Sequence, residues 1–239
     1  MGLDASRFIN NRAKKHSLTL SRVNNILIAV IKSYQTIKAE NVVFYYSQRG
    51  KIAKENYLRN RLVYDYLDKE LKAIKDGTTN YNVTPESTEE YISEKDGLLH
   101  SDPIDIRVQI IDDGLSEVWR VEEQIYLAIE CKRFTSGSVT NYVGDIEKFT
   151  NRTYRGLRLP FEGQIGFIEK EGLTHNTLFQ YINKRLSSST CTIETLKQLD
   201  FYRIKQDFDG SYHSEHKRKS GKRFEIFHLF FNYSNHIKN

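Results

Sequence analysis

The sequence predicts an α/β protein in which a mixed central β-sheet is flanked by helices. Helical spacing of apolar residues dominates the first third of the chain, whereas later apolar runs are short and rich in β-branched residues. Helical stretches recur between those later runs, and strands interleaved with helices form a sheet covered by helices. With 38% apolar residues among 239, the chain can bury a sizeable core.

Charge and cysteine content narrow the function classes. The chain has 36 Lys and Arg against 31 Asp and Glu, and the resulting charge of +5 weakly favours a polyanionic partner. Two cysteines, Cys131 and Cys191, are too few for a disulfide framework or a four-ligand zinc site. The longest apolar stretch, residues 26–31, is too short to span a bilayer, so we expect a cytoplasmic protein without membrane contact.

The first part of the chain is expected to be helical. Apolar residues at helical spacing predict one helix over about 18–39 and a second over about 51–74. We therefore divide the chain into a helical N-terminal extension, 1–46, available for docking or dimerisation, and a main domain, 47–239. Turn-forming residues over 76–88 predict a loop.

After these helices, the spacing of apolar residues changes from that of helices to that of strands. Residues 104–111 are β-branched and end at an Asp-Asp-Gly turn, which predicts a strand. Residues 126–131 are apolar on both faces and predict a central strand. A helix is expected over 142–154.

Strands and helices also alternate in the rest of the chain. We expect a short strand over 164–168, a helix over 176–186, and late strands over 201–204 and 224–231.

Three charged residues fall on the predicted strands. Glu130 and Lys132 share one face because side chains alternate along a strand, while Ile129 and Cys131 point the other way. A carboxylate and an ammonium on a central apolar strand are costly unless they are paired or bind something. Asp105 begins the preceding strand, where a near neighbour in the sheet would bring it beside Glu130.

These residue types suit metal-assisted hydrolysis. Two adjacent carboxylates repel each other and bind a hard cation such as Mg²⁺. The ion lowers the pKa of a bound water, and Lys132 would stabilise charge growing on a phosphate. The alternatives are that Asp105 caps a turn while Glu130 and Lys132 only pair with each other, and that Asp102 replaces Asp105 as first carboxylate.

Glu55 is a further candidate ligand. It precedes Leu62 by seven residues and Tyr66 by eleven, so it shares the inward face of the second predicted helix. The alternatives are a surface ion pair with Arg59 or a favourable charge at the helix N-terminus.

The order of helix with Glu, strand with Asp, strand with Glu-x-Lys, helix and strand resembles the PD-(D/E)xK, restriction-endonuclease-like nucleases over about 51–231. The chain departs from the short motif by placing Ile104 between Pro103 and Asp105. The resemblance implies that fold, with Asp105 and Glu130 as metal ligands, Lys132 as a catalytic residue and Glu55 as an accessory ligand.

The resemblance also implies an activity. It predicts a Mg²⁺-dependent DNA endonuclease, with Mn²⁺ as a substitute, in restriction or anti-phage defence. Such a protein is expected to act as a homodimer or as a subunit of a larger assembly. Cleavage of RNA, and a nuclease-like subunit that binds nucleic acid or a partner without cutting, are the alternatives.

A basic segment, residues 213–223, lies between two predicted strands and is interpreted as a loop that binds phosphates, with a solvated turn as the alternative. Its two histidines are too few for zinc. The predicted nucleic-acid contacts are Arg133, Lys148, His216, Lys217, Arg218, Lys219, Lys222 and Arg223.

Overall fold

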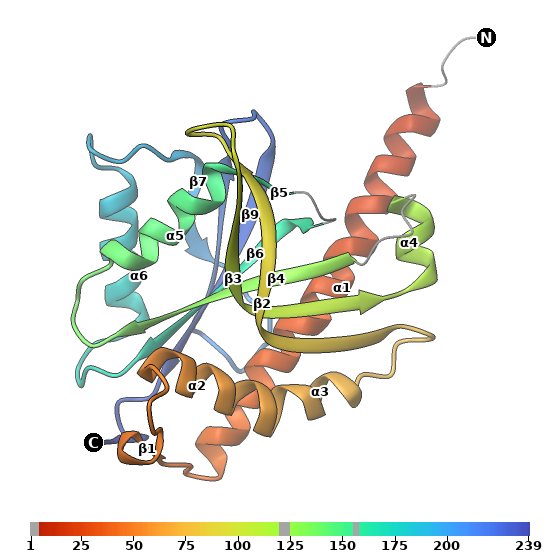
Figure 1. The fold of residues 1–239 in the computed structure, drawn as a ribbon. Coiled ribbons are helices and arrows are strands. Elements are labelled where there is room, and N and C mark those ends of the chain that lie inside the picture. The colour runs from red at the N-terminus through yellow and green to blue at the C-terminus, as the bar shows by residue number, and fades with distance from the viewer. Residues whose placement is uncertain (1–4, 120–124, 155–157) are drawn as a thin grey trace.

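The computed structural model describes residues 5–119, 125–154 and 158–239. An eight-stranded, curled, mostly antiparallel sheet runs through the molecule, with helices on both faces (Figure 1). The strand order is β5-β2-β3-β4-β6-β9-β8-β7. The predicted α/β class with a mixed, helix-flanked sheet is therefore confirmed.

The strands of the large sheet are β2 (Asn80–Ser93), β3 (Leu99–Ile111), β4 (Ile125–Phe134), β5 (Arg152–Tyr154), β6 (Arg158–Ile168), β7 (Glu194–Phe201), β8 (Ser211–Lys217) and β9 (Arg223–Asn232). A separate two-stranded sheet pairs β1 (Phe44–Tyr45) with β10 (Ile237–Lys238). The helices are α1 (Ala5–Ala39), η1 (Tyr46–Gln48), α2 (Lys54–Leu62), η2 (Val63–Leu67), α3 (Asp68–Lys72), α4 (Asp113–Trp119), α5 (Thr140–Thr150) and α6 (His175–Leu186).

The centre of the sheet is parallel and its flanks are antiparallel. β4, β6 and β9 run in the same direction, and the register places Glu130, Gln164 and His228 in one row across them. Residues in such a row share a face of the sheet. The strands β2, β3 and β4 on one side, and β9, β8 and β7 on the other, pair antiparallel.

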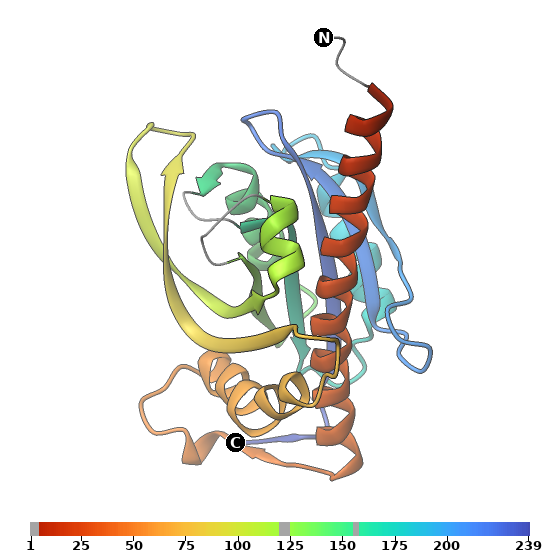
Figure 2. The same ribbon diagram turned by 90° about the vertical axis from the view of Figure 1, so that its right-hand side faces the viewer.

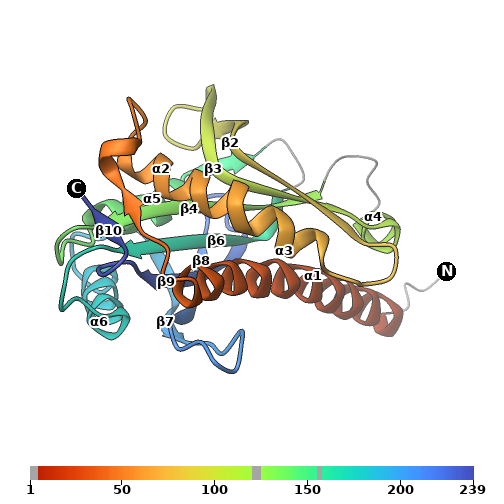
Figure 3. The ribbon, with the colours of Figure 1, turned by 90° about the horizontal axis from the view of Figure 1, so that it is seen from below.

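Each face of the sheet has its own hydrophobic core. Ile165 and Phe167 on β6 belong to a core shared with α1, whereas Phe230 on β9 belongs to a second core shared with α5 and α6. Figure 2 shows α1 running along one side of the sheet and the long β2–β3 hairpin curving away from it. The view from below shows α1 and α6 well apart, at the right and at the left of the molecule (Figure 3).

The helix α1 is part of the main core. It begins at Ala5, well before the predicted start at 18, and its inward residues lie in the same cluster as those of β6 and β9. Tyr34 stacks on Phe231 with ring centroids 4.4 Å apart. The predicted extension 1–46, of which residues 1–4 lie outside the described part, therefore does not form a core of its own.

The predicted loop over 76–88 is wrong, because most of it lies in β2. Pairing with β3 over nearly its whole length overrides the local turn preferences of these residues. Pro85 is tolerated because β5 pairs with β2 only from Tyr91 to Ser93 and leaves that stretch at the edge. Glu86, the next residue, has a positive φ of 55°.

The other predicted boundaries of helices and strands differ less from the observed ones. The helix predicted over about 51–74 runs from Lys54 to Lys72 as α2, η2 and α3, with the π-helical segment η2 in its middle. The helix predicted over 142–154 ends at Thr150, and 152–154 form β5 instead. The strand predicted over 201–204 lies earlier, at β7, and β8 occupies the first half of the predicted basic loop. Within the part of the chain that the structure describes, no helix has the length and apolar character to cross a membrane.

Candidate functional site

Strand pairing brings the predicted carboxylates together. The pairing of β3 with β4 extends to Ile106 and Ile129, and Asp105 and Glu130 are the next residues on the two strands. Lys132 shares the face of Glu130, while Cys131 is buried in the core on the α1 side.

Asp105 is held by two donors. Arg59 Nη1 lies 2.8 Å from Asp105 Oδ1, and the backbone N–H of Cys131 donates to Oδ2 at 2.8 Å. Asp105 therefore bridges α2 and β4 and does not cap a turn. Arg59 also pairs with Glu86 at 2.9 Å, and its side chain is only 1% exposed.

Glu55 lies beside the predicted catalytic lysine. Its Oε1 accepts from Lys132 Nζ at 3.2 Å, and its Oε2 accepts from the backbone N–H of Arg133 at 3.1 Å. The alternative pair with Arg59 does not form, since Arg59 binds Asp105 and Glu86 instead. The helical spacing that placed Glu55 on the inward face thus brings it to the end of β4.

Asp145 is a site residue that the sequence analysis missed. It lies on α5 with 2% of its side chain exposed, 3.2 Å from Lys132 Nζ and 2.9 Å from Lys148 Nζ. The signal was present in the sequence, because Asp145 falls between Tyr142 and Phe149 at helical spacing on the apolar side of α5. A carboxylate on such a side needs a cationic partner.

The charges of the site shift one another's pKa values. Burial raises the pKa of Glu55, Lys132 lowers it, and Asp105 raises it again. Burial alone would lower the pKa of Lys132, but the carboxylates of Asp145, Glu55 and Asp105 more than offset it and raise the pKa. Lys132 is therefore a fixed cation at neutral pH.

Oxygen atoms suited to a hard cation lie on this face. Gln164, beside Glu130 in the sheet, donates from Nε2 to the carbonyl of Tyr142 at 2.8 Å. Its Oε1 is buried and has no hydrogen-bond partner among the described residues. A carbonyl oxygen near carboxylates is the donor type that Mg²⁺ accepts. Across residues 5–119, 125–154 and 158–239, however, no three His, Cys, Asp or Glu side chains are arranged to hold a metal ion.

Asp102 lies away from this cluster. It lies three positions before Asp105, so the two side chains point to opposite faces of β3. Asp102 is bound by Arg152 and lies 3.4 Å from the hydroxyl of Tyr91. Of the two candidates, Asp105 is the one beside Glu130.

The predicted nucleic-acid contacts divide into two groups. His216 is fully buried, and Arg218 is buried against Glu162 at 2.8 Å, so neither is placed to meet a phosphate at the surface. Lys219, Lys222 and Arg223 are exposed, as the solvated-turn alternative also predicts. Arg133 pairs with Glu169, Lys217 with Glu194, and Lys148 with Asp145.

His216 belongs to a buried hydrogen-bonded chain that the sequence did not reveal. Ser214 Oγ lies 2.8 Å from both His216 Nε2 and His228 Nε2. His228 Nδ1 lies 2.9 Å from the hydroxyl of Tyr142 on α5. Thr195 Oγ1 meets His216 Nδ1 at 3.2 Å. We call these five residues the histidine network.

Comparisons with family models, curated proteins and solved structures find no match to this chain. The functional argument therefore depends on the geometry of the site.

Proposed function

We propose that this protein is a Mg²⁺-dependent nuclease of the PD-(D/E)xK kind that hydrolyses phosphodiester bonds of DNA. The observation that carries the proposal is the juxtaposition of Glu55, Asp105 and Lys132 from three different elements. Glu55 lies 3.2 Å from Lys132, and Asp105 accepts a hydrogen bond from the backbone N–H of Cys131, the residue between Glu130 and Lys132. Charged side chains on a largely buried sheet lose hydration, which costs free energy. We therefore expect these residues to bind a ligand whose interactions offset that cost.

Each residue has a role in the proposed reaction. Asp105 and Glu130 would hold the cation, with the unpartnered Gln164 Oε1 and Glu55 as further oxygen donors. The bound cation supplies a water of lowered pKa and neutralises phosphate charge. Lys132, kept protonated by its carboxylate neighbours, would stabilise the negative charge of the transition state.

The resemblance supports a biological setting only at the level of analogy. Nucleases of this kind suggest restriction or anti-phage defence in the cytoplasm, as a homodimer or a subunit of a larger assembly. RNA is the alternative substrate, because phosphodiester chemistry is common to both nucleic acids.

The test is cleavage of supercoiled plasmid with Mg²⁺ or Mn²⁺. We expect nicking or linearisation by the wild type, and a loss of about 10²–10³-fold or more in Lys132→Ala and Asp105→Ala. Lys72→Ala is the matched control, because Lys72 is exposed and ion-paired on the remote helix α3. Thermal unfolding of each variant verifies folding. Cleavage that survives both site substitutions would show that the site is assigned wrongly.

A second candidate function is binding of nucleic acid without cleavage. The observation that favours it is Arg59, whose buried guanidinium occupies Asp105 Oδ1 at 2.8 Å and already neutralises that carboxylate. Wild type that binds duplex DNA, single-stranded DNA or RNA but cuts none of them with either metal would support this function.

A further inference from the structure

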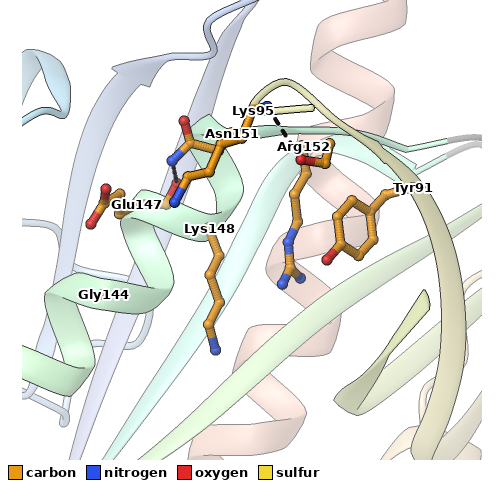
Figure 4. A pocket seen from close by; sticks show the side chains of 8 residues that line it. Tyr91, Lys95, Gly144, Glu147, Lys148, Asn151 and Arg152 are labelled. Carbon is orange, nitrogen blue, oxygen red and sulfur yellow. Dashed lines mark hydrogen bonds between the residues drawn. The ribbon is translucent and has the colours of Figure 1, made fainter. Parts of the chain in front are cut away.

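A small basic pocket lies next to the proposed site. It has a volume of about 170 Å³ and is lined by Tyr91, Ser93, Lys95, Gly144, Glu147, Lys148, Asn151 and Arg152. The pocket lies between the turn of the β2–β3 hairpin and the C-terminal half of α5 (Figure 4). Pockets for drug-sized ligands have roughly 300–1,000 Å³, so this one suits a single small group.

Three cationic residues from three elements line this pocket. Lys95 comes from the β2–β3 turn, Lys148 from α5 and Arg152 from β5. Figure 4 shows the side chains of Lys148 and Arg152 extending in the same direction from the chain. Lys95 is exposed and makes no ion pair within the described residues. Glu147, the one acid of the lining, accepts from Thr192 at 3.1 Å.

Arg152 is held in place by two neighbours. Its guanidinium lies over the ring of Tyr91, 4.1 Å from the centroid, and one of its nitrogens binds Asp102. The side chain is 14% exposed, so its conformation is fixed and little rotamer freedom remains to be lost on binding. A fixed guanidinium fork with further N–H donors suits a phosphate.

The pocket is connected to the proposed catalytic lysine through one carboxylate. Asp145 lies 2.9 Å from Lys148 Nζ on the pocket side and 3.2 Å from Lys132 Nζ on the site side. A phosphate in the pocket would therefore be separated from a phosphate at Lys132 by the width of a single side chain. Consecutive phosphates of one nucleic-acid strand meet such a requirement.

We infer that this pocket binds a backbone phosphate of the substrate strand that neighbours the scissile one. Lys95, Lys148 and Arg152 hold that phosphate and so fix the position of the strand relative to Lys132. This inference rests on the proposed function for the identity of the strand, but the binding of phosphate by these residues does not depend on cleavage.

The experiment measures binding of a fluorescent 20-base-pair DNA duplex by anisotropy in EDTA over a range of salt concentrations. Lys95→Glu is expected to weaken binding at least about tenfold, and Lys72→Glu to leave it within about twofold. In Lys95→Ala/Lys148→Ala, the slope of log K against log salt is expected to fall by about one, which is one phosphate contact.

Cleavage is scored separately with Mg²⁺ on the same variants, so the two proposals fail in different ways. A wild type that binds with the expected slope loss but never cuts supports the pocket and overturns the nuclease. An unchanged slope in the double variant, or equal effects of Lys95→Glu and Lys72→Glu, overturns the pocket even if cleavage is robust. Absence of binding to duplex DNA, single-stranded DNA and RNA by wild type also overturns it.

Discussion

Two polar clusters lie side by side on one face of the sheet and differ in charge. The proposed site around Lys132 is half-buried and built from charged pairs, with Glu55 at 28% and Lys132 at 19% exposure. The histidine network is interior except for the partly buried Thr195, and burial lowers the pKa of its two histidines. The residues around Lys132 stay charged because opposite charges and solvent stabilise them. The histidines of the network stay neutral because they have neither opposite charges nor solvent beside them.

The two clusters meet on α5. Tyr142 bonds His228, and Asp145, one helical turn later, pairs with Lys132. The neutral network therefore anchors the helix that carries part of the charged site. The comparison predicts that variants of the network change stability, and that variants of the site change activity.

The largest effect is expected for His228→Leu. The substitution leaves the hydroxyl of Tyr142 without its partner in the interior and removes one of the two histidine partners of Ser214, and an unpaired buried group costs about 1–3 kcal/mol. We expect the free energy of unfolding, measured with urea, to fall by about 3 kcal/mol. The control is His100→Gln at an exposed histidine. Equal effects of the two substitutions would remove the distinction between a network and a surface histidine.

A smaller effect is expected for Glu55→Gln. We expect this substitution to reduce activity and to leave stability unchanged. The amide keeps the shape of the side chain but removes the charge that binds Lys132. Substitution of a group that orients a metal site typically reduces activity about 10–100-fold. We expect that loss in plasmid cleavage, with a melting temperature close to that of wild type because Glu55 is partly solvated. A large drop in melting temperature would assign Glu55 a structural role instead.

Acid pH should act on the histidine network. Burial lowers the pKa of His216 to about 3, with a smaller effect of His213, while an unfolded histidine titrates near its ordinary value of 6.5. The unfolded chain thus binds more protons below 6.5, and stability present above that pH is lost as the pH falls. Each neutral buried histidine contributes a slope of about 1.4 kcal/mol per pH unit.

This pH dependence is measured as the free energy of unfolding between pH 7 and pH 4. His216→Gln is expected to give a shallower dependence than wild type, and His100→Gln the same dependence as wild type. If His216→Gln leaves the slope unchanged, the interior histidine is not a source of the acid sensitivity.

The smallest effect is expected for Lys217→Ala. Lys217 pairs with Glu194 at 3.0 Å, but both side chains are well exposed and such pairs contribute less than about 1 kcal/mol. We expect a change in the free energy of unfolding within about 0.5 kcal/mol. DNA binding of the same variant tests whether the basic segment 213–223 contacts phosphates. If Lys217 makes such a contact, its loss weakens binding and reduces the salt dependence of binding.

The sequence by itself determined the α/β class, the central strand and the burial of Cys131. Apolar runs of that kind require burial on both faces wherever the strand lies, so local pattern is sufficient. The spacing of Glu55 against Leu62 likewise fixed its side of α2, and alternation placed Glu130 and Lys132 on one face.

Only the tertiary structure decided which charges meet. Asp145 reaches Lys132 because α5 packs against the sheet, and Arg59 reaches Asp105 because α2 packs against β3 and β4. Residues 80–88 became a strand since β3 supplied the partner that their turn-forming composition did not reveal. The basic segment 213–223 divided into interior and surface residues through its pairing with β9. Such contacts join positions far apart in the chain, and no local spacing encodes them.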